Sequence, residues 1–329
     1  MLIIFKQHVT NAEINDFNRA ISGYGKLISI DGRNAVIVSK NLLSQTLCAA
    51  EIIEEIVEFP DKLYFTKYVE KPLKIANLLC GDRNILAIAG PCAIESEQQI
   101  FASAQIVKEA GAQILRGGAF KPRSSCYDFQ GLGNKGLQLL HVAARAHGLL
   151  CISEIMDSKD LDKFDDLVDI IQVGARNMQN YALLKELGQI RKPIVLKRGL
   201  AATYQDLLLS AEYLMSAGNQ QVILCERGIR TFESATRNTL DISAIPYLQS
   251  KTNCPVIVDP SHAIGMRDFV PQLAYAAVAA GADGIMLEVH PEPDTSISDA
   301  KQTIDAETFK QAVSKMREIA NLFDKTFGA

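Results

Sequence analysis

The sequence contains no tryptophan, no C-x-x-C pair and no long hydrophobic run. Its apolar stretches fall short of the ~20 residues that span a bilayer, so we expect no membrane partner. It also lacks a basic excess, because 34 Lys and Arg stand against 38 Asp and Glu, which gives a net charge of -4. This balance argues against a nucleic-acid partner. A charge at Lys6 interrupts the apolar N-terminus early, so we expect no secretory signal there.

The cysteines are odd in number and scattered along the chain, a pattern that fits a reducing cytoplasm better than a disulfide framework. They are Cys48, Cys80, Cys92, Cys126, Cys151, Cys225 and Cys254. The chain has 329 residues, of which 48% are hydrophobic, the balance of an ordinary globular protein. This length suits two domains, or one large α/β barrel with an appendage.

Residues 1–65 are predicted to form a separate small domain of the ferredoxin-like α+β type, with the element order β-α-β-β-α-β. A turn signal at Asp31-Gly32 predicts a hairpin, and Thr10 or Asn11 is a suitable cap for the first helix. The predicted elements are strands at Leu2–Phe5, Lys26–Ile30, Ala35–Val38 and near Glu54–Glu58, and helices at Asn11–Ser22 and near Asn41–Leu47. Between Pro60 and Pro72, Tyr64–Val69 is predicted to be a strand that covers the next domain.

Residues 66–329 alternate short apolar runs with longer helical patterns such as Gln98–Ala110, Gly136–Ala146 and Thr203–Ala217. The eight runs are Ile85–Ala89, Gln113–Leu115, Leu149–Ser153, Ile170–Val173, Ile194–Leu196, Gln221–Cys225, Val256–Val258 and Gly284–Leu287. Eight β/α units predict a (β/α)₈ TIM barrel, with a doubly wound open sheet as the alternative that periodicity leaves open.

The residues that follow these runs matter because the active site of such a barrel lies where strands end. Seven of them are cationic: Arg116, Lys121, Arg123, Arg176, Lys197, Arg198 and Arg227. Any one alone could be a solvated surface charge, but seven at one barrel mouth would repel one another unless anions neutralise them. Arg and Lys suit phosphate and carboxylate, so the cluster predicts substrates with more than one anionic group.

A second set of strand-end residues has metal-binding chemistry. Cys92, His262 and Glu288, with an acidic residue in the loop after the eighth strand, suit a divalent transition metal. The residues alone leave another interpretation open, in which Cys92 is a buried small hydrophobe and His262 an ordinary polar loop residue.

The chain resembles a known family at these positions. Gly90-Pro91-Cys92-Ala93-Ile94-Glu95-Ser96, Lys121-Pro122-Arg123-Ser124-Ser125, Asp259-Pro260-Ser261-His262 and Glu288-Val289-His290-Pro291 are similar to motifs of 3-deoxy-D-arabino-heptulosonate-7-phosphate (DAHP) synthases, nearest the short Iβ type. The likeness spans residues 70–325. Residues 1–65 resemble, by pattern only, the ACT-related regulatory domain that some members carry.

The resemblance implies the first step of the shikimate pathway to aromatic amino acids: phosphoenolpyruvate condenses with erythrose 4-phosphate to DAHP and inorganic phosphate. It implies a divalent cation such as Mn, Fe, Co or Zn, with Asp299 as the fourth ligand beside Cys92, His262 and Glu288. The residues implied for phosphoenolpyruvate are Arg116, Lys121, Arg176, Lys197 and Arg227. Those implied for the aldose phosphate are Arg123 and Ser124, where the family often has threonine, with Ser125 nearby. Arg198 is a further substrate-binding candidate.

Three residues are expected to take part in catalysis. Lys121 is the expected proton donor to the aldehyde oxygen, with a pKa lowered by neighbouring cations. Glu154 is expected to orient or deprotonate the attacking water; a structural ion pair with an arginine is the alternative. Asp259 is expected to act chiefly by positioning a lysine or His262.

The resemblance also implies a cytoplasmic homotetramer, with tyrosine or phenylalanine as feedback effector at the N-terminal domain. The alternative role of this domain is to cap the barrel or to join subunits.

Three other functions are open. A 3-deoxy-manno-octulosonate 8-phosphate synthase shares the barrel, but typically has Lys-Ala-Asn-Arg where this chain has Lys121-Pro122-Arg123-Ser124. A Schiff-base aldolase would use Lys197. A non-enzymatic binding module would need no metal.

Overall fold

The computed structural model describes residues 2–20, 26–30, 33–37, 51–57, 63, 65–67, 69–123 and 125–328. The chain divides into two compact units, Met1–Val69 and Glu70–Ala329. The division lies close to the domain boundary predicted after residue 65.

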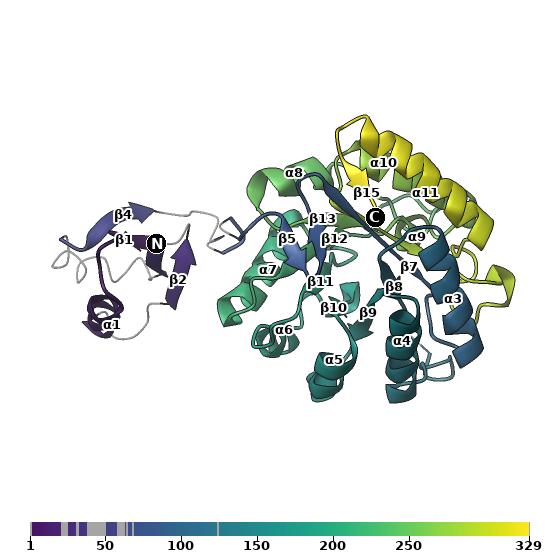
Figure 1. The fold of residues 1–329 in the computed structure, drawn as a ribbon, viewed down its shortest axis with the longest axis horizontal. Helices are drawn as coiled ribbons and strands as arrows, with labels where there is room; N and C mark the ends of the chain where they lie inside the picture. Colours follow the sequence, from purple (N-terminus) through teal and green to yellow (C-terminus); the bar gives the residue numbers. More distant parts are fainter. Residues whose placement is uncertain are drawn as a thin grey trace. The chain divides into compact units, whose positions relative to one another are not determined.

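The first unit contains a four-stranded antiparallel sheet in the order β2-β3-β1-β4 (Figure 1). Its elements are β1 (Leu2–Phe5), α1 (Asn11–Ala20), β2 (Lys26–Ile30), β3 (Arg33–Ile37) and β4 (Ile53–Val57). This strand order is that of the ferredoxin-like motif. The predicted helix near Asn41–Leu47 and the turn at Asp31-Gly32 lie outside the described residues.

Helix α1 begins where the sequence offers a capping box. The Thr10 hydroxyl accepts a hydrogen bond from the Glu13 backbone N–H (3.3 Å), and the Glu13 carboxylate accepts one from the Thr10 N–H (2.8 Å). The apolar face of the helix places Ile14 and Phe17 in the core, where the Phe17 ring meets Phe5 edge to face at 5.3 Å.

The second unit is a closed barrel of eight parallel strands, because β14 pairs with β7. The strands are β7 (Asn84–Gly90), β8 (Ile114–Arg116), β9 (Leu150–Ile155), β10 (Ile170–Val173), β11 (Ile194–Lys197), β12 (Val222–Glu226), β13 (Val256–Val258) and β14 (Gly284–Glu288). All eight predicted strands are confirmed to within a residue or two at their ends. Closure excludes the open sheet.

Helices surround the barrel (Figure 1). They are α3 (Glu97–Glu109), α4 (Asn134–Ala146), α5 (Leu161–Leu167), α6 (Tyr181–Leu187), α7 (Tyr204–Ala217), α8 (Ala244–Lys251), α9 (Pro260–Ile264), α10 (Val270–Ala279) and α11 (Ala306–Asn321). The short strand β15 (Thr326–Phe327) returns the C-terminus to β7.

The strand predicted over residues 64–69 is wrong, since the described residues there form turns and bends. The chain instead makes a hairpin of β5 (Leu73–Ile75) and β6 (Leu78–Cys80). Ile75 and Cys80 join the buried cluster formed by the first residues of the barrel strands, such as Ile114. The hairpin therefore covers the end of the barrel at which the strands begin. In barrels of this type the active site lies at the other end, where the strands finish.

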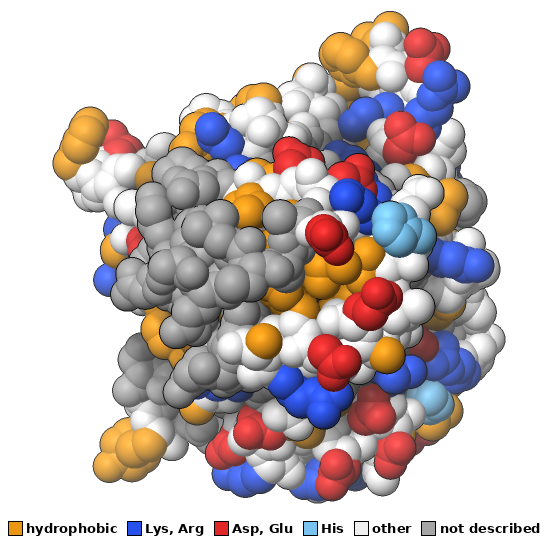
Figure 2. All heavy atoms as spheres, turned by 90° about the vertical axis from the view of Figure 1, so that its left-hand side faces the viewer, with side chains coloured by type: hydrophobic (Ala, Val, Ile, Leu, Met, Phe, Trp, Pro, Cys, Tyr) orange, Lys and Arg blue, Asp and Glu red, His pale blue; other side chains and the backbone are white. Residues whose placement is uncertain are grey.

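On the coloured part of the surface that Figure 2 shows, acidic and basic side chains are interspersed with apolar and neutral polar ones. Among the described residues, no helix combines the length and the apolar character that membrane crossing requires.

Candidate active site and metal centre

A cavity of about 210 Å³ opens at the carboxyl ends of the barrel strands. Five of the seven predicted cations line it: Lys121, Arg123, Arg176, Lys197 and Arg227. Its wall also includes Glu154, His262 and Asp299. The cavity thus brings together five of the seven predicted cations, the predicted catalytic residue Glu154, and two of the four predicted metal ligands, His262 and Asp299.

Three polar lining residues were missed by the sequence analysis: Arg230, Arg237 and Asn238. They lie in the long connection between β12 and α8, beyond the first residues after the strand. The length of this connection, with its two additional arginines, is the signal that could have revealed them.

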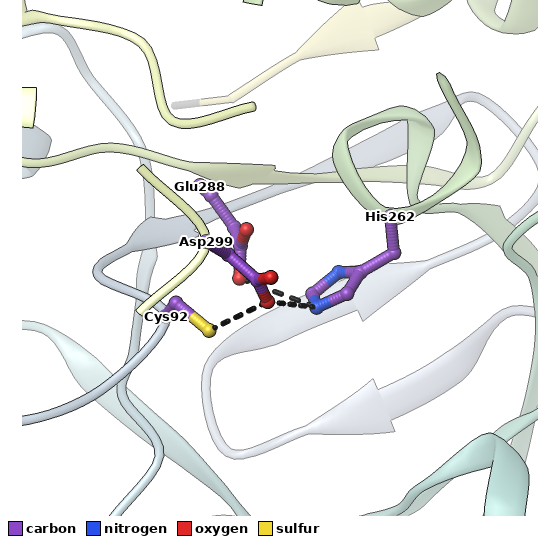
Figure 3. A group of neighbouring side chains, drawn as sticks. All are labelled: Cys92, His262, Glu288 and Asp299. Atoms are coloured by element: carbon purple, nitrogen blue, oxygen red, sulfur yellow. Dashed lines mark hydrogen bonds and ion pairs between the residues drawn. The ribbon is translucent and has the colours of Figure 1, made fainter. Parts of the chain in front are cut away.

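Four predicted ligands meet in one group beside the cavity (Figure 3). The candidate donor atoms of Cys92, His262, Glu288 and Asp299 all lie within 4.8 Å of one another. Cys92 Sγ is 3.1 Å from Asp299 Oδ2, and His262 Nε2 is 3.3 Å from Glu288 Oε1. A thiol, an imidazole and two carboxylates in this arrangement fit a borderline divalent cation.

Asp259 orients the imidazole of this group. Its Oδ2 lies 2.7 Å from His262 Nδ1, which leaves Nε2 facing Glu288. Such a carboxylate contact fixes the ring of a metal-binding histidine. The same carboxylate pairs with the Lys197 ammonium, and Asp259 is fully buried. Burial by itself raises the pKa of Asp259, but His262 and Lys197 outweigh it and hold this pKa well below its usual value. Asp259 is not among the cavity-lining residues, and its side-chain contacts are with His262 and Lys197.

Glu288 is also held by neighbours. Arg116 Nη1 donates to its Oε1 at 2.8 Å, and the Gln302 amide donates to Oε2. Burial works to raise the pKa of Glu288, but His262 and Arg116 lower it overall, so the carboxylate is ionised. Arg116 is buried behind this carboxylate and is not among the cavity-lining residues.

Burial raises the pKa of the Cys92 thiol to about 12, and the nearby Glu288 charge adds to this effect. A bound divalent cation reverses such a shift, because it stabilises the thiolate. Lys121 Nζ lies 3.0 Å from Cys92 Sγ and donates to the Cys92 carbonyl at 2.8 Å. Gly118 makes this approach possible, since a Cβ there would lie 2.7 Å from the same carbonyl oxygen.

The expectation that cations depress the pKa of Lys121 is wrong. Burial lowers this pKa, but Cys92, Glu288 and Glu154 outweigh burial and raise it above its ordinary value. The strand-end cations were visible in the sequence, whereas the anionic groups that face this amine depend on the fold.

Glu154 projects into the cavity from β9. Gln172 Nε2 donates to its Oε2 at 3.2 Å, and in the described part of the chain no ion pair to Glu154 is present. A Cβ on Gly174 would lie 1.9 Å from Glu154 Oε1, so a larger residue there would displace the Glu154 carboxylate from this position. The geometry therefore does not favour the alternative of a structural ion pair.

Arg123 contacts the loop that carries Asp299. Its Nη2 donates to Ser298 Oγ at 2.6 Å, and its Nε donates to the Phe129 carbonyl at 3.1 Å. Ser124 lies outside the described residues. Ser125 Oγ accepts a hydrogen bond from Tyr127 N–H at 3.2 Å and is not among the cavity-lining residues.

Arg198 lies away from the cavity. Its Nη1 donates to Glu226 Oε2 at 2.9 Å and to Asp241 Oδ2 at 2.8 Å, and its guanidinium stacks on the Tyr204 ring. Arg198 is thus paired with two carboxylates and is not among the cavity-lining residues.

Comparison with known proteins relates this chain to DAHP synthases and, at lower identity, to 2-dehydro-3-deoxyphosphooctonate aldolases. The model of the DAHP synthetase I family matches residues 67–323. A Thermotoga maritima phospho-2-dehydro-3-deoxyheptonate aldolase is 40% identical over 98% of both chains. A crystal structure with that name superposes with a TM-score of 0.78 at 38% identity, covering 99% of both chains. A Francisella tularensis 2-dehydro-3-deoxyphosphooctonate aldolase is 29% identical over 76% of this chain and 97% of its own.

Proposed function

Because the chain belongs to the DAHP synthetase I family and condenses phosphoenolpyruvate with erythrose 4-phosphate, we propose that this reaction takes place in the cavity at the barrel mouth. The products are DAHP and inorganic phosphate, in the first step of the shikimate pathway. The proposal depends above all on one observation: seven cationic side chains line one cavity, beside a group of four metal-binding side chains. We also propose that the enzyme works in the cytoplasm, which agrees with the six free cysteines in the described part of the chain.

Cys92, His262, Glu288 and Asp299 are the proposed ligands of a divalent cation. When bound, such a cation supplies Lewis-acid polarisation of an aldehyde oxygen. The pKa of Asp299 supports the assignment: burial works to raise it, but His262 and Arg237 lower it to about 2. The side chain therefore offers a carboxylate at neutral pH.

The cavity cations are proposed to bind phosphoenolpyruvate through its phosphate and carboxylate. Arg176, Lys197 and Arg227 line the wall, and Lys197 is held in place by Asp259. Lys121 is proposed to give its proton to the aldehyde oxygen as C3 of phosphoenolpyruvate attacks the aldehyde carbon. Glu154 is proposed to orient the water that adds to C2, after which the C–O bond to phosphate breaks.

Arg123 is proposed to bind the phosphate of the aldose. Its contacts with Ser298 Oγ and a carbonyl oxygen leave it without a carboxylate partner among the described residues, so its charge is available to an anion. Arg123→Ala is expected to raise KM for erythrose 4-phosphate by roughly 10- to 100-fold, since a charge-assisted contact is lost. KM for phosphoenolpyruvate should change far less.

Steady-state kinetics with each substrate varied in turn measures this difference. Arg123→Lys is expected to restore the effect only in part, because an ammonium cannot offer the two-pronged geometry of a guanidinium. Equal increases in both KM values contradict the assignment.

The structure disfavours a Schiff-base aldolase using Lys197. The Lys197 ammonium is paired with the buried Asp259 carboxylate, and an ammonium has no free electron pair to attack a carbonyl. Borohydride reduction in the presence of substrate tests this alternative, and we expect no covalent adduct on Lys197.

The N-terminal unit is proposed to sense tyrosine or phenylalanine in a homotetramer. None of the proposed catalytic groups lies in residues 1–65, and a solved truncated form of the Thermotoga maritima synthase covers 81% of this chain. Deletion of residues 1–65 is therefore expected to leave an active barrel that no longer responds to these amino acids. An effector can change the activity only if it binds two arrangements of the protein, one open and one closed to substrate, with different affinities.

Initial rates of the full-length and truncated enzymes, with millimolar tyrosine or phenylalanine, measure this response. Inhibition of the full-length enzyme alone supports the proposal. A full-length enzyme that is insensitive to both amino acids leaves the domain with a capping or subunit-joining role.

A further inference from the structure

Two residues of the sequence motifs have no part in the reaction as described so far. Glu95 lies three residues after Cys92 in the loop that follows β7, and His290 lies two residues after Glu288 in the segment that follows β14. Both lie close to the loop of residues 292–303, the Asp299 loop, which brings its carboxylate to the proposed metal centre.

Glu95 binds the Asp299 loop directly. Its Oε1 accepts a hydrogen bond from the Ile297 backbone N–H at 2.9 Å and one from Ser296 Oγ at 3.2 Å. These contacts join the two loops that carry Cys92 and Asp299. Between the same loops, Cys92 Sγ lies 3.1 Å from Ser298 Oγ.

His290 faces the other oxygen of the same carboxylate. Its Nδ1 accepts a hydrogen bond from the Glu292 backbone N–H at 3.0 Å, so its proton lies on Nε2. Nε2 is 3.5 Å from Glu95 Oε2 and has no closer partner in the described part of the chain. His290 is buried and its Nε2 forms no hydrogen bond in the described part of the chain, so the Glu95 carboxylate is the acceptor within reach of this N–H.

The backbone of the Asp299 loop needs such support. Asp299 has φ of +57°, a left-handed conformation that is uncommon for residues other than glycine and persists where neighbours enforce it. Arg267 Nη2 holds one side of the loop through the Ala300 carbonyl at 2.7 Å. Glu95 holds the side that faces Cys92.

We propose that Glu95 is a positioning residue of the metal centre: its carboxylate ties the Ser296–Ile297 segment and His290 to the Cys92 loop, and so fixes Asp299 near Cys92. This inference rests on the proposed metal site. Neighbours that orient metal ligands typically contribute 10- to 100-fold to metal affinity. Glu95 should therefore act on cation binding more than on stability.

Titration of the metal-free, full-length enzyme with Co²⁺ tests this proposal, because a cobalt–thiolate bond gives a charge-transfer absorption band. Glu95→Ala is expected to raise the Kd for Co²⁺ by at least tenfold, while turnover recovers towards the wild-type value at saturating metal. Glu95→Gln should raise Kd less, since an amide can accept from Ile297 or from His290 but not from both.

Glu97→Ala is the matched control, because Glu97 is an exposed carboxylate in the first turn of α3. Its Kd should equal that of the wild type. An increase below tenfold in Glu95→Ala, or an equal increase in Glu97→Ala, overturns the inference. If Glu95→Ala does not fold, an unchanged Kd in Glu95→Gln overturns it. A wild-type enzyme without a thiolate band contradicts the proposed metal site itself.

Discussion

Cys92→Ala is expected to lower kcat by on the order of 10³-fold at saturating substrates, with a matching loss of affinity for divalent metal. Removal of the thiol takes away one of four proposed ligands in a group whose donor atoms lie within 4.8 Å of one another. Polarisation of a carbonyl by a metal contributes several kcal/mol, and each ~1.4 kcal/mol corresponds to a factor of ten in rate. Metal content and initial rates, measured on the same preparation, test this expectation.

Cys151→Ala provides the matched control. Cys151 is as fully buried as Cys92, and burial also raises its pKa to about 12, but its Sγ donates to the Leu167 carbonyl away from the metal-binding group. This variant should lose some stability and keep both its metal and its turnover. If Cys92→Ala behaves like Cys151→Ala, Cys92 is a packing residue and not a ligand.

Lys121→Met is expected to lower kcat by roughly 10²- to 10⁴-fold, the usual contribution of a positioned proton donor. The pKa of Lys121 is raised because Cys92, Glu288 and Glu154 together outweigh burial. A lysine whose pKa lies above its ordinary value carries its proton at neutral pH and so enters the reaction as the acid. Rates measured at saturating concentrations of both substrates separate this loss from weaker binding.

Lys121→Arg distinguishes the two roles proposed for this residue. A guanidinium keeps the positive charge, so KM for phosphoenolpyruvate should stay near the wild-type value. It does not release its proton, so kcat should stay low. Recovery of kcat in Lys121→Arg indicates that Lys121 contributes charge and not a proton.

The barrel could be predicted because each strand is a short apolar run that ends in glycine or a charged residue. Glu288 ends one of these strands and Cys92 and His262 follow two others, so the barrel geometry brings the three together. Asp299 lies in an irregular loop, and only the family resemblance indicated it. Arg237, which lies 3.2 Å from the Asp299 carboxylate, belongs to a long connection without periodicity and was missed.

Two features of the structure could not be predicted from the sequence, for physical reasons. A hairpin of residues 73–80 stands in place of the predicted strand over residues 64–69. Its apolar residues Leu73, Ile75, Leu78 and Cys80 pack against the end of the barrel, and the local sequence does not indicate this long-range contact. Arg198 follows a strand as the cavity cations do, yet it points to Glu226 and Asp241. A position at the carboxyl end of a strand predicts that the residue lies at the mouth of the barrel. It does not predict whether the side chain points into the cavity.

Phosphate release from phosphoenolpyruvate in the presence of erythrose 4-phosphate, before and after chelation, tests the central claim most directly. We expect the full-length enzyme to lose this activity when divalent cations are removed and to regain it when Mn²⁺ is returned. Unchanged phosphate release after exhaustive chelation would contradict a metal-dependent condensation at Cys92, His262, Glu288 and Asp299.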